Sequence, residues 1–239
     1  MKYIEKFKFR LDDMDQNGEL KNESILKILE SIAGYHSDAI GYGYLNLSDK
    51  KIGWILLDWR IEVIKRPKYP EELTITTWGR KMIKCYTYRD FEIRNESGEL
   101  CIKASSKWTL FDLATGKLAK LTEEIVDSFN PEEISVFEED FSKLKQPDKI
   151  DSKIDYTIRK SEIDSNGHLH NTCYLNLAYE VMPEELFFED SLNNMRISYK
   201  KEIKYGETVE CRYSYEEDKH IVTIVSKDGE NVHAILQLW

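Results

Sequence analysis

The chain has 239 residues, of which 41% are hydrophobic and 33% charged, a balance typical of a globular protein with a sizeable core. Its formal net charge of −10 argues against a broad nucleic-acid-binding face, because such a face needs clustered positive charge. No apolar run approaches about 18 residues, so no membrane span is predicted. The N-terminus lacks the apolar core of a signal peptide, and the four cysteines form no Cys-x-x-Cys pair, which together predict a reduced, cytoplasmic protein.

The first half of the chain predicts one strand, a turn, one helix and then a series of strands. A strand at about residues 3–11 leads into the turn Asp15-Gln16-Asn17-Gly18, and apolar residues at helical spacing predict a helix over residues 24–40. Further strands are expected at residues 59–65, 73–80, 86–95 and 100–112. We assign residues 1–122 to this first unit. Residues 123–152 are charge-rich, contain two prolines and show no sustained period, which predicts a linker with a short helix around residues 132–141.

The second half, residues 153–239, repeats this order of elements. A strand at residues 153–159 precedes the turn Asp164-Ser165-Asn166-Gly167 and a helix over about residues 174–181. Strands are then expected at residues 194–203, 208–216, 220–227 and 231–239. One helix followed by an antiparallel meander indicates an α+β unit with the helix packed on one face of the sheet.

Comparison of the chain with itself supports a duplication. Residues 14–22 resemble residues 163–171, at an offset of 149. Parts of residues 60–71 resemble parts of residues 196–207, at an offset of 136, and a weaker third match follows in the same order. Three matches in register indicate two copies of one structural unit.

The turn in each half resembles the start of an EF-hand calcium loop, but that loop needs a bidentate glutamate at its twelfth position. The twelfth position is Ser24 in the first half and Cys173 in the second. Asp164, His168 and His170 could form another metal site, but no His-Glu-x-x-His motif and no third nearby histidine supports it. We therefore expect neither a metal nor a cofactor.

The second turn differs from the first in chemistry. A hydrogen-bonded turn that leads into a helix, with Asn171 or Thr172 as N-cap, would explain both copies. It does not explain why His168 stands where the first copy has Glu19, and histidine can exchange protons near neutral pH.

A second difference between the two copies lies on the later strand, where Glu202 aligns with Arg66 and the charge is therefore reversed. Glu202 is either part of a solvated charged strand or a carboxylate that faces the His168 turn and acts as a base on water. No Gly-rich phosphate loop and no Gly-x-Ser-x-Gly elbow is present, and Cys173 is expected to be a buried thiol rather than a nucleophile.

With these motifs, the chain resembles the bacterial acyl-acyl carrier protein (acyl-ACP) thioesterases, which are related to the plant plastid enzymes. The run Asp-x-Asn-x-His-x-x-Asn, followed by a helix and a strand with Tyr-x-x-Glu, is the most specific part of the likeness. The resemblance covers nearly the whole chain, in residues 14–41, 53–78, 88–118, 161–183 and 197–207.

This resemblance implies a double hotdog, in which each of two tandem units wraps an antiparallel sheet around a helix. It implies hydrolysis of the fatty acyl thioester on acyl carrier protein, which releases free fatty acid and ends chain elongation. The catalytic residues that it implies lie in the C-terminal unit: Asp164, Asn166, His168 and Glu202. Plant members commonly have a cysteine after the glutamate, whereas this chain has Ile203, which favours direct attack by water.

For that reaction we expect Glu202 to position the water together with His168, while either of the two takes the proton. Asn166 would orient the substrate or the water, and Asp164 would hold Asn166 or His168 in place. Backbone N–H groups at the start of the helix after Asn171 could receive the developing oxyanion, because a helix N-terminus presents free donors.

The first unit retains the turn but has Glu19 for His168 and Arg66 for Glu202, and the resemblance implies that it shapes the acyl pocket. Candidate walls are the helix over residues 24–40 and Trp54, Ile55 and Leu57, although each of them could equally be ordinary core. Because acyl carrier protein is acidic, docking needs a local basic patch. The candidates beside the site are Lys200, Lys201 and Lys204; similar clusters occur at Lys65, Arg66 and Lys68 and at Arg80, Lys81 and Lys84.

Two other functions stay open. One is a hotdog thioesterase that acts on acyl-CoA, and the other is a non-enzymatic acyl-binding protein that kept the fold. A monomer and a homodimer are both compatible with the sequence, and neither the length nor the saturation of the preferred acyl chain follows from it.

Overall fold

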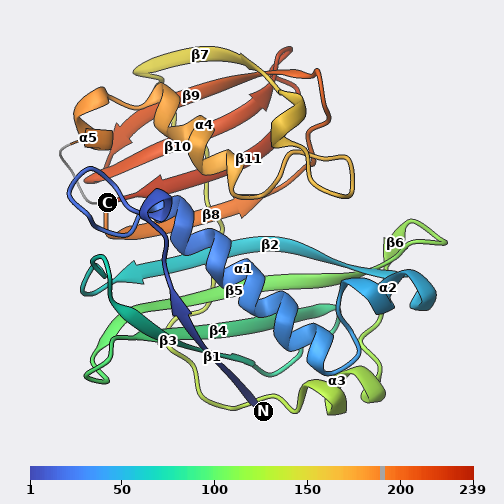
Figure 1. Cartoon of the computed structure of the whole chain (residues 1–239). Coiled ribbons are helices and arrows are strands. Elements are labelled where there is room, and N and C mark those ends of the chain that lie inside the picture. Colours follow the sequence, from blue (N-terminus) through green and yellow to red (C-terminus); the bar gives the residue numbers. More distant parts are fainter. Residues whose placement is uncertain (189–191) are drawn as a thin grey trace. The chain divides into compact units, whose positions relative to one another are not determined.

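A computed structural model of the chain describes residues 1–188 and 192–239 (Figure 1). The chain divides into two compact units, Met1–Asp140 and Phe141–Trp239. The boundary between the units falls inside the segment that the sequence indicates as a linker. In the described part of the chain, no helix is both long and apolar enough to cross a membrane.

The first unit contains an antiparallel sheet in the strand order β1-β3-β4-β5-β2 (Figure 1). A two-residue strand, β6, pairs with β5 outside this order. The strands are β1 (Lys2–Lys8), β2 (Ile52–Val63), β3 (Glu72–Gly79), β4 (Tyr86–Arg94), β5 (Leu100–Asp112) and β6 (Lys117–Leu118).

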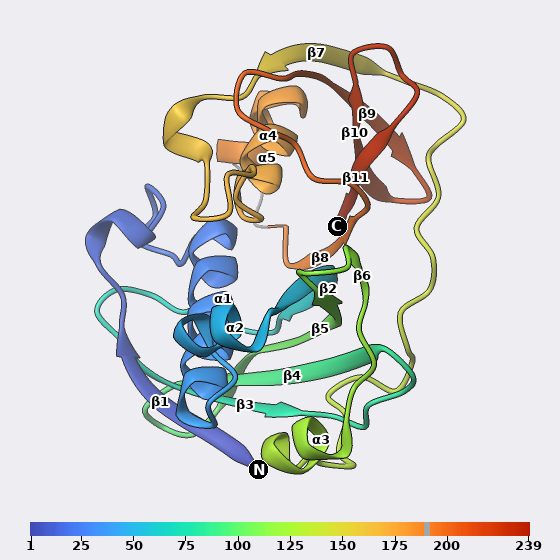
Figure 2. The same cartoon turned by 90° about the vertical axis from the view of Figure 1, so that its right-hand side faces the viewer.

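Helix α1 (Asn22–Ala39) lies against one face of this sheet (Figure 2). Its apolar residues recur at helical spacing, and Ile25, Leu29 and Ile32 have no exposed surface. Trp59 from β2 is also fully buried, so the core of the unit lies between α1 and the sheet. The predicted helix over residues 24–40 agrees with this element. The unit also contains α2 (Tyr44–Lys50) and α3 (Glu123–Phe129).

The prediction of a short helix around residues 132–141 is wrong. The helix of this segment is α3, because the Thr122 side chain caps its start by accepting the N–H of Ile125. The left-handed conformation of Asn130, with φ 41°, ends the helix directly before Pro131. Residues 131–140 then run as an irregular strap.

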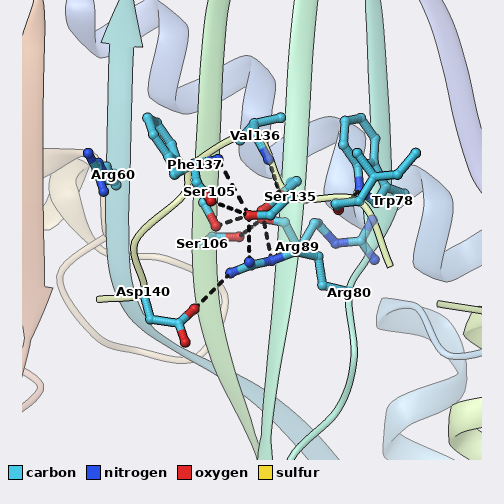
Figure 3. A network of polar contacts seen from close by, with 12 residues as sticks. Arg60, Trp78, Arg80, Arg89, Ser105, Ser106, Ser135, Val136, Phe137 and Asp140 are labelled. Carbon is cyan, nitrogen blue, oxygen red and sulfur yellow. Dashed lines mark hydrogen bonds and ion pairs between the residues drawn. The ribbon is translucent and has the colours of Figure 1, made fainter. Parts of the chain in front are cut away.

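The strap is fixed to the first unit by a buried carboxylate (Figure 3). Asp90 has no exposed surface and accepts hydrogen bonds from the Ser105 hydroxyl at 2.7 Å and the Val136 N–H at 2.9 Å. The Arg80 Nε lies 3.2 Å from the same carboxylate, and Trp78 donates to the Ile134 carbonyl. Burial raises the pKa of Asp90, and the donors around it offset part of that effect.

The strap and α1 cover opposite faces of the sheet. Arg89, the neighbour of Asp90 on β4, donates to Nδ1 of His36 on α1 at 2.8 Å, whereas Asp90 contacts the strap. Successive residues of a strand point to opposite faces, so one strand connects both layers.

The second unit repeats the plan of the first. Its antiparallel sheet has the order β8-β11-β10-β9-β7, and helix α4 packs against it (Figure 1). The elements are β7 (Ser152–Thr157), α4 (Cys173–Val181), α5 (Glu184–Phe188), β8 (Asn194–Tyr199), β9 (Thr208–Glu216), β10 (Lys219–Ser226) and β11 (Val232–Leu238). Each unit is thus one principal helix on an antiparallel sheet, the α+β hotdog arrangement, present twice.

The duplication extends to the connecting segment. In the first unit, Arg60 donates to the Glu139 carbonyl at 3.4 Å and its guanidinium lies 4.1 Å from the Phe137 ring centre. In the second unit, Arg196 donates to the Ser142 carbonyl at 2.8 Å. The repeat aligns Arg60 with Arg196. In each unit, the equivalent arginine therefore bonds the part of the connecting segment that belongs to that unit.

A buried histidine in the first unit makes stability sensitive to acid. His36 has no exposed surface, and its Nδ1 accepts the hydrogen bond from Arg89, which can only donate. Burial and the Arg89 charge lower the pKa of His36 from 6.5 to about 4. The unfolded chain therefore binds this proton below pH 6.5, while the folded chain binds it only near pH 4.

We expect the wild type to lose about 2 to 3 kcal/mol more unfolding free energy than His36→Gln between pH 7 and pH 4.5. The sign follows from the lowered pKa, because protonation favours the unfolded chain in this window. Urea unfolding of both proteins at the two pH values measures the difference. An equal loss in both proteins would show that His36 is not the group that titrates.

Candidate active site

The turn at Asp164–Gly167 follows a short 3-10 helix (Lys160–Glu162) of the second unit and is closed by backbone hydrogen bonds. The Asp164 N–H donates to the His168 carbonyl at 2.8 Å, and the Gly167 N–H donates to the Asp164 carbonyl at 3.1 Å. Gly167 has φ 82°, a left-handed conformation that glycine adopts without steric cost. The Asp-x-Asn-Gly pattern therefore forms a local turn that presents His168 at its end.

Asp164 also holds the turn through its side chain. Its Oδ1 accepts the N–H groups of Asn166 at 2.9 Å and His168 at 3.0 Å. Its Oδ2 lies 3.3 Å from the Asn166 side-chain amide, which donates to it. The carboxylate thus orients the His168 backbone and the Asn166 side chain.

The turn brings His168 next to the segment that follows β8. His168 forms an isolated bridge with Lys204, and the Leu169 N–H donates to the Ile203 carbonyl at 2.8 Å. As a result His168 Nε2 lies 3.5 Å from Glu202 Oε1. The His168 side chain is 31% exposed and that of Glu202 58%, so water reaches both groups.

Glu202 does not lie on a regular strand, which corrects the expectation from the sequence. Strand β8 ends at Tyr199 because the N–H groups of Lys200 and Lys201 both donate to the His233 carbonyl, which interrupts the regular ladder. Glu202 follows on an irregular segment that pairs with the turn instead. The strand pattern in the sequence could not show this change of partner.

The first unit builds the same turn with other side chains. Asp15 Oδ1 accepts the N–H groups of Asn17 at 2.8 Å and Glu19 at 2.9 Å, as Asp164 does in the second unit. Glu19 forms an ion pair with Lys68 at 3.0 Å. Arg66, at the position of Glu202, donates to the Leu20 carbonyl at 2.6 Å. The backbone of the site is duplicated, whereas the histidine–carboxylate pair occurs in the second unit alone.

We expect Asp164→Ala and Asp15→Ala to cost similar stability, about 1 kcal/mol each, because they remove equivalent hydrogen bonds. Only Asp164→Ala should lower kcat for the expected thioester hydrolysis, by about 10- to 100-fold. It removes the hydrogen bond that holds the His168 backbone. Urea unfolding and turnover of both variants test this matched pair. Equal kcat values in the two variants would exclude a positioning role for Asp164.

The three candidate pocket residues lie on β2 but do not share one face. Trp54 is half-buried and packs edge-on against Phe129, with ring centres 5.7 Å apart. Ile55, which points to the opposite face, is 39% exposed. Leu57 lies at a bulge, where the pairing with β5 shifts register.

The three candidate docking lysines are exposed. Lys200 Nζ donates to the Ser198 hydroxyl at 2.6 Å, and Lys201 Nζ donates to the Asn231 side chain at 3.1 Å. Lys204 pairs through its backbone with His168. The structure thus places all three beside Glu202, on the segment that carries it.

The start of α4 offers few donors for an oxyanion. The Thr172 N–H donates to Nδ1 of His170 at 3.3 Å, and the Cys173 N–H donates to the His170 carbonyl at 2.9 Å. The Leu175 N–H is bonded to the Thr172 carbonyl. These three N–H groups already have acceptors, so the oxyanion role expected at this helix start is not assigned to them.

Two tyrosines lie near the turn that the sequence motifs do not predict as part of the site. The Tyr199 hydroxyl donates to the Asn171 carbonyl at 3.0 Å, and the Tyr199 ring meets that of Tyr174 edge-on, with centres 5.2 Å apart. The repeat contains the signal that could have found them, because the first copy has Ile25 and Val63 at these positions. Both tyrosines thus occur only in the copy with the histidine–carboxylate pair.

Tyr174 lies within electrostatic reach of the site. Burial raises its pKa, and the negative charges of Glu202 and Asp164 raise it further. The phenol therefore stays neutral near neutral pH. Among the described residues, no group of three His, Cys, Asp or Glu side chains lies together in a way that could hold a metal ion.

Two family models match the chain. The acyl-ACP thioesterase N-terminal domain matches residues 1–129, and the acyl-ACP thioesterase C-terminal domain matches residues 145–239. A chloroplastic oleoyl-acyl carrier protein thioesterase of Coriandrum sativum is 24% identical over 96% of this chain and 67% of its own length. A second one, from Arabidopsis thaliana, is 26% identical over 92% of this chain and 65% of its own length. The chain therefore spans about two thirds of these relatives.

Solved structures agree in fold. The acyl-ACP thioesterase from Bacteroides thetaiotaomicron superposes with a TM-score of 0.88 at 22% identity, over 99% of this chain and 96% of that one. The 12:0-ACP thioesterase from Umbellularia californica superposes with a TM-score of 0.87 at 16% identity, over the same shares. These likenesses establish the double hotdog. Together, the two family models cover most of the sequence, and the chain belongs to the acyl-ACP thioesterase family.

Proposed function

We propose that the chain hydrolyses the thioester of a fatty acyl chain carried by acyl carrier protein, and that the C-terminal unit is the catalytic one. The observation that carries the assignment to this unit is the pair of His168 and Glu202, 3.5 Å apart and open to water. The first unit has the same turn but no such pair. The proposal places the activity in the cytoplasm, with a monomer or a homodimer as its form.

In the proposed reaction, a water molecule that contacts both Glu202 and His168 attacks the thioester carbonyl carbon. One of the two side chains takes the proton of the water as the C–O bond forms, and Asn166 orients the water or the acyl group. The tetrahedral intermediate then collapses with cleavage of the C–S bond. The carrier leaves as a thiolate, which is a good leaving group because a thiol has a pKa near 8.5. The free fatty acid is the other product.

Carrier binding would use the positive charges beside this pair. Lys200, Lys201 and Lys204 lie on the same exposed segment as Glu202. An acidic carrier protein that docks on them would bring its thioester to the carboxylate that activates the water. Trp54, Ile55 and Leu57 remain proposed contacts of the acyl chain in the first unit.

The test is the release of free fatty acid from a panel of acyl-carrier-protein thioesters, from C8 to C18, beside the matched acyl-CoA series. Turnover of the carrier-bound series supports the proposal and shows the preferred chain length. Preference for the CoA series would make the chain an acyl-CoA thioesterase instead. Binding of acyl chains without turnover of either series would show a non-enzymatic acyl-binding protein.

A further inference from the structure

A buried histidine outside the proposed catalytic residues holds the segment that carries Glu202. His233 lies on β11 and is 3% exposed. Its carbonyl accepts the N–H groups of Lys200 at 2.8 Å and Lys201 at 3.3 Å. Its side-chain Nδ1 lies 3.1 Å from the Lys201 carbonyl. A carbonyl oxygen can only accept, so Nδ1 carries the proton and donates it.

These three hydrogen bonds fix the two residues directly before Glu202. On the other side, the Ile203 carbonyl accepts the Leu169 N–H at 2.8 Å, and Lys204 pairs with His168. Glu202 thus sits between two backbone anchors, one from β11 and one from the turn. Because its own side chain is 58% exposed, packing around the carboxylate contributes little to its position. The backbone anchors must therefore set where the carboxylate stands.

The first unit has the equivalent backbone hydrogen bonds but not the side-chain hydrogen bond. There, the Cys101 carbonyl accepts the N–H groups of Ile64 at 2.8 Å and Lys65 at 3.0 Å, as the His233 carbonyl does in the second unit. The Cys101 thiol lies 3.5 Å from the carbonyl of Glu99, the residue directly before β5. It makes no hydrogen bond to the Lys65 carbonyl. The side-chain bond from β11 to the segment is therefore an addition in the unit that carries the His168–Glu202 pair.

We propose that His233 is a positioning residue for the hydrolysis, which acts by holding the Lys201 carbonyl and thereby the Glu202 carboxylate at its distance from His168. This inference rests on the proposed function. The physical reason is the steep dependence of a reaction rate on the alignment of the reacting groups, since a displacement of about 1 Å can cost about 100-fold. His233 is buried and bonds the backbone, not the Lys200 and Lys201 side chains that would dock the carrier, so its loss should lower kcat far more than it changes KM.

The test compares two substitutions of His233. His233→Leu fills a similar volume without a donor, and we expect it to lower kcat about 10- to 100-fold with KM within about twofold. His233→Asn keeps an N–H donor near the position of Nδ1 and should recover most of the lost kcat. A double substitution completes the test. His233→Leu should have no further effect on kcat once Glu202→Gln is present, because it acts through Glu202.

A control and a structural readout distinguish positioning from a general loss of stability. Cys101→Ala removes a buried side chain at the matched strand position of the first unit and should leave kcat within about twofold. Hydrogen exchange of the Lys200 and Lys201 amides should be at least about tenfold faster in His233→Leu and close to the wild-type rate in His233→Asn. This readout needs no substrate, so it tests the anchor even if no thioester is hydrolysed.

Several results would overturn the inference. Unchanged kcat in His233→Leu would do so, and so would unchanged amide exchange in that variant. A loss of kcat that persists in the Glu202→Gln background would show that His233 acts by another route. Failure of the proposed function looks different: the wild type would then release no fatty acid from any thioester, whatever stands at position 233.

Discussion

Replacing Glu202 by glutamine is expected to lower kcat for the preferred acyl-carrier-protein thioester about 100- to 10,000-fold, the range of a lost general base. The amide keeps the size and hydrogen-bonding reach of the carboxylate but cannot take a proton from water. Because Glu202 is largely exposed, the substitution should leave the unfolding free energy within about 0.5 kcal/mol of the wild type. Turnover and urea unfolding of the purified variant measure the two quantities.

The matched control is Glu19→Gln in the first unit. Glu19 stands at the end of the equivalent turn and pairs with Lys68 at 3.0 Å, so its substitution removes a carboxylate from the same backbone setting. We expect its kcat to remain within about twofold of the wild type, because this turn carries no histidine beside the carboxylate. If both variants lost activity equally, the assignment of the reaction to the C-terminal unit would fail.

Replacing His168 by glutamine is the second large effect, with an expected loss in kcat of about 100- to 10,000-fold. The substitution removes the imidazole whose Nε2 lies 3.5 Å from Glu202 and leaves the backbone bonds of the turn to Asp164 intact. If one water is held by both groups, the double variant with Glu202→Gln should be hardly slower than the worse single variant. Single-turnover rates with carrier-bound substrate measure this coupling without interference from product release.

A histidine elsewhere in the same unit provides the control. His220 bonds the Tyr213 hydroxyl at 2.9 Å on neighbouring strands, and His220→Gln is expected to keep kcat within about twofold. Full additivity of the His168 and Glu202 losses would argue against a shared water and favour two separate roles. A His168→Gln variant as active as the wild type would exclude the histidine from the chemistry.

The turns are the clearest case of what could be read in advance. Asp164 and Asp15 bond the N–H groups two and four residues further along the chain, and Gly167 adopts the left-handed conformation that closes the turn. All partners lie within five residues, so the short motif determines the geometry. The helix α1 was equally accessible, because its apolar residues recur with the helical period.

Contacts over long sequence separations were not accessible in this way. The sequence predicts a helix where the structure has the strap over residues 131–140, because the partner of the strap is Asp90, whose burial no local pattern reveals. The sequence predicts a strand at Glu202 where the structure has an irregular segment, because the ladder is interrupted by His233, which lies 31 residues away along the chain. The hydrogen bond of Tyr199 is not predicted by any local pattern, since its acceptor, the Asn171 carbonyl, belongs to another element.

The amino-acid sequence by itself determined the duplication, the two turns and the α+β class, and its family motif predicts four catalytic residues. These features depend on spacing and on bonds between near neighbours. Only the tertiary structure decided that His168 meets Glu202 and that His233 holds the segment that carries Glu202. The physical reason is that each of the two contacts between elements requires the register of strands and turns from distant parts of the chain, which only packing of the whole unit establishes.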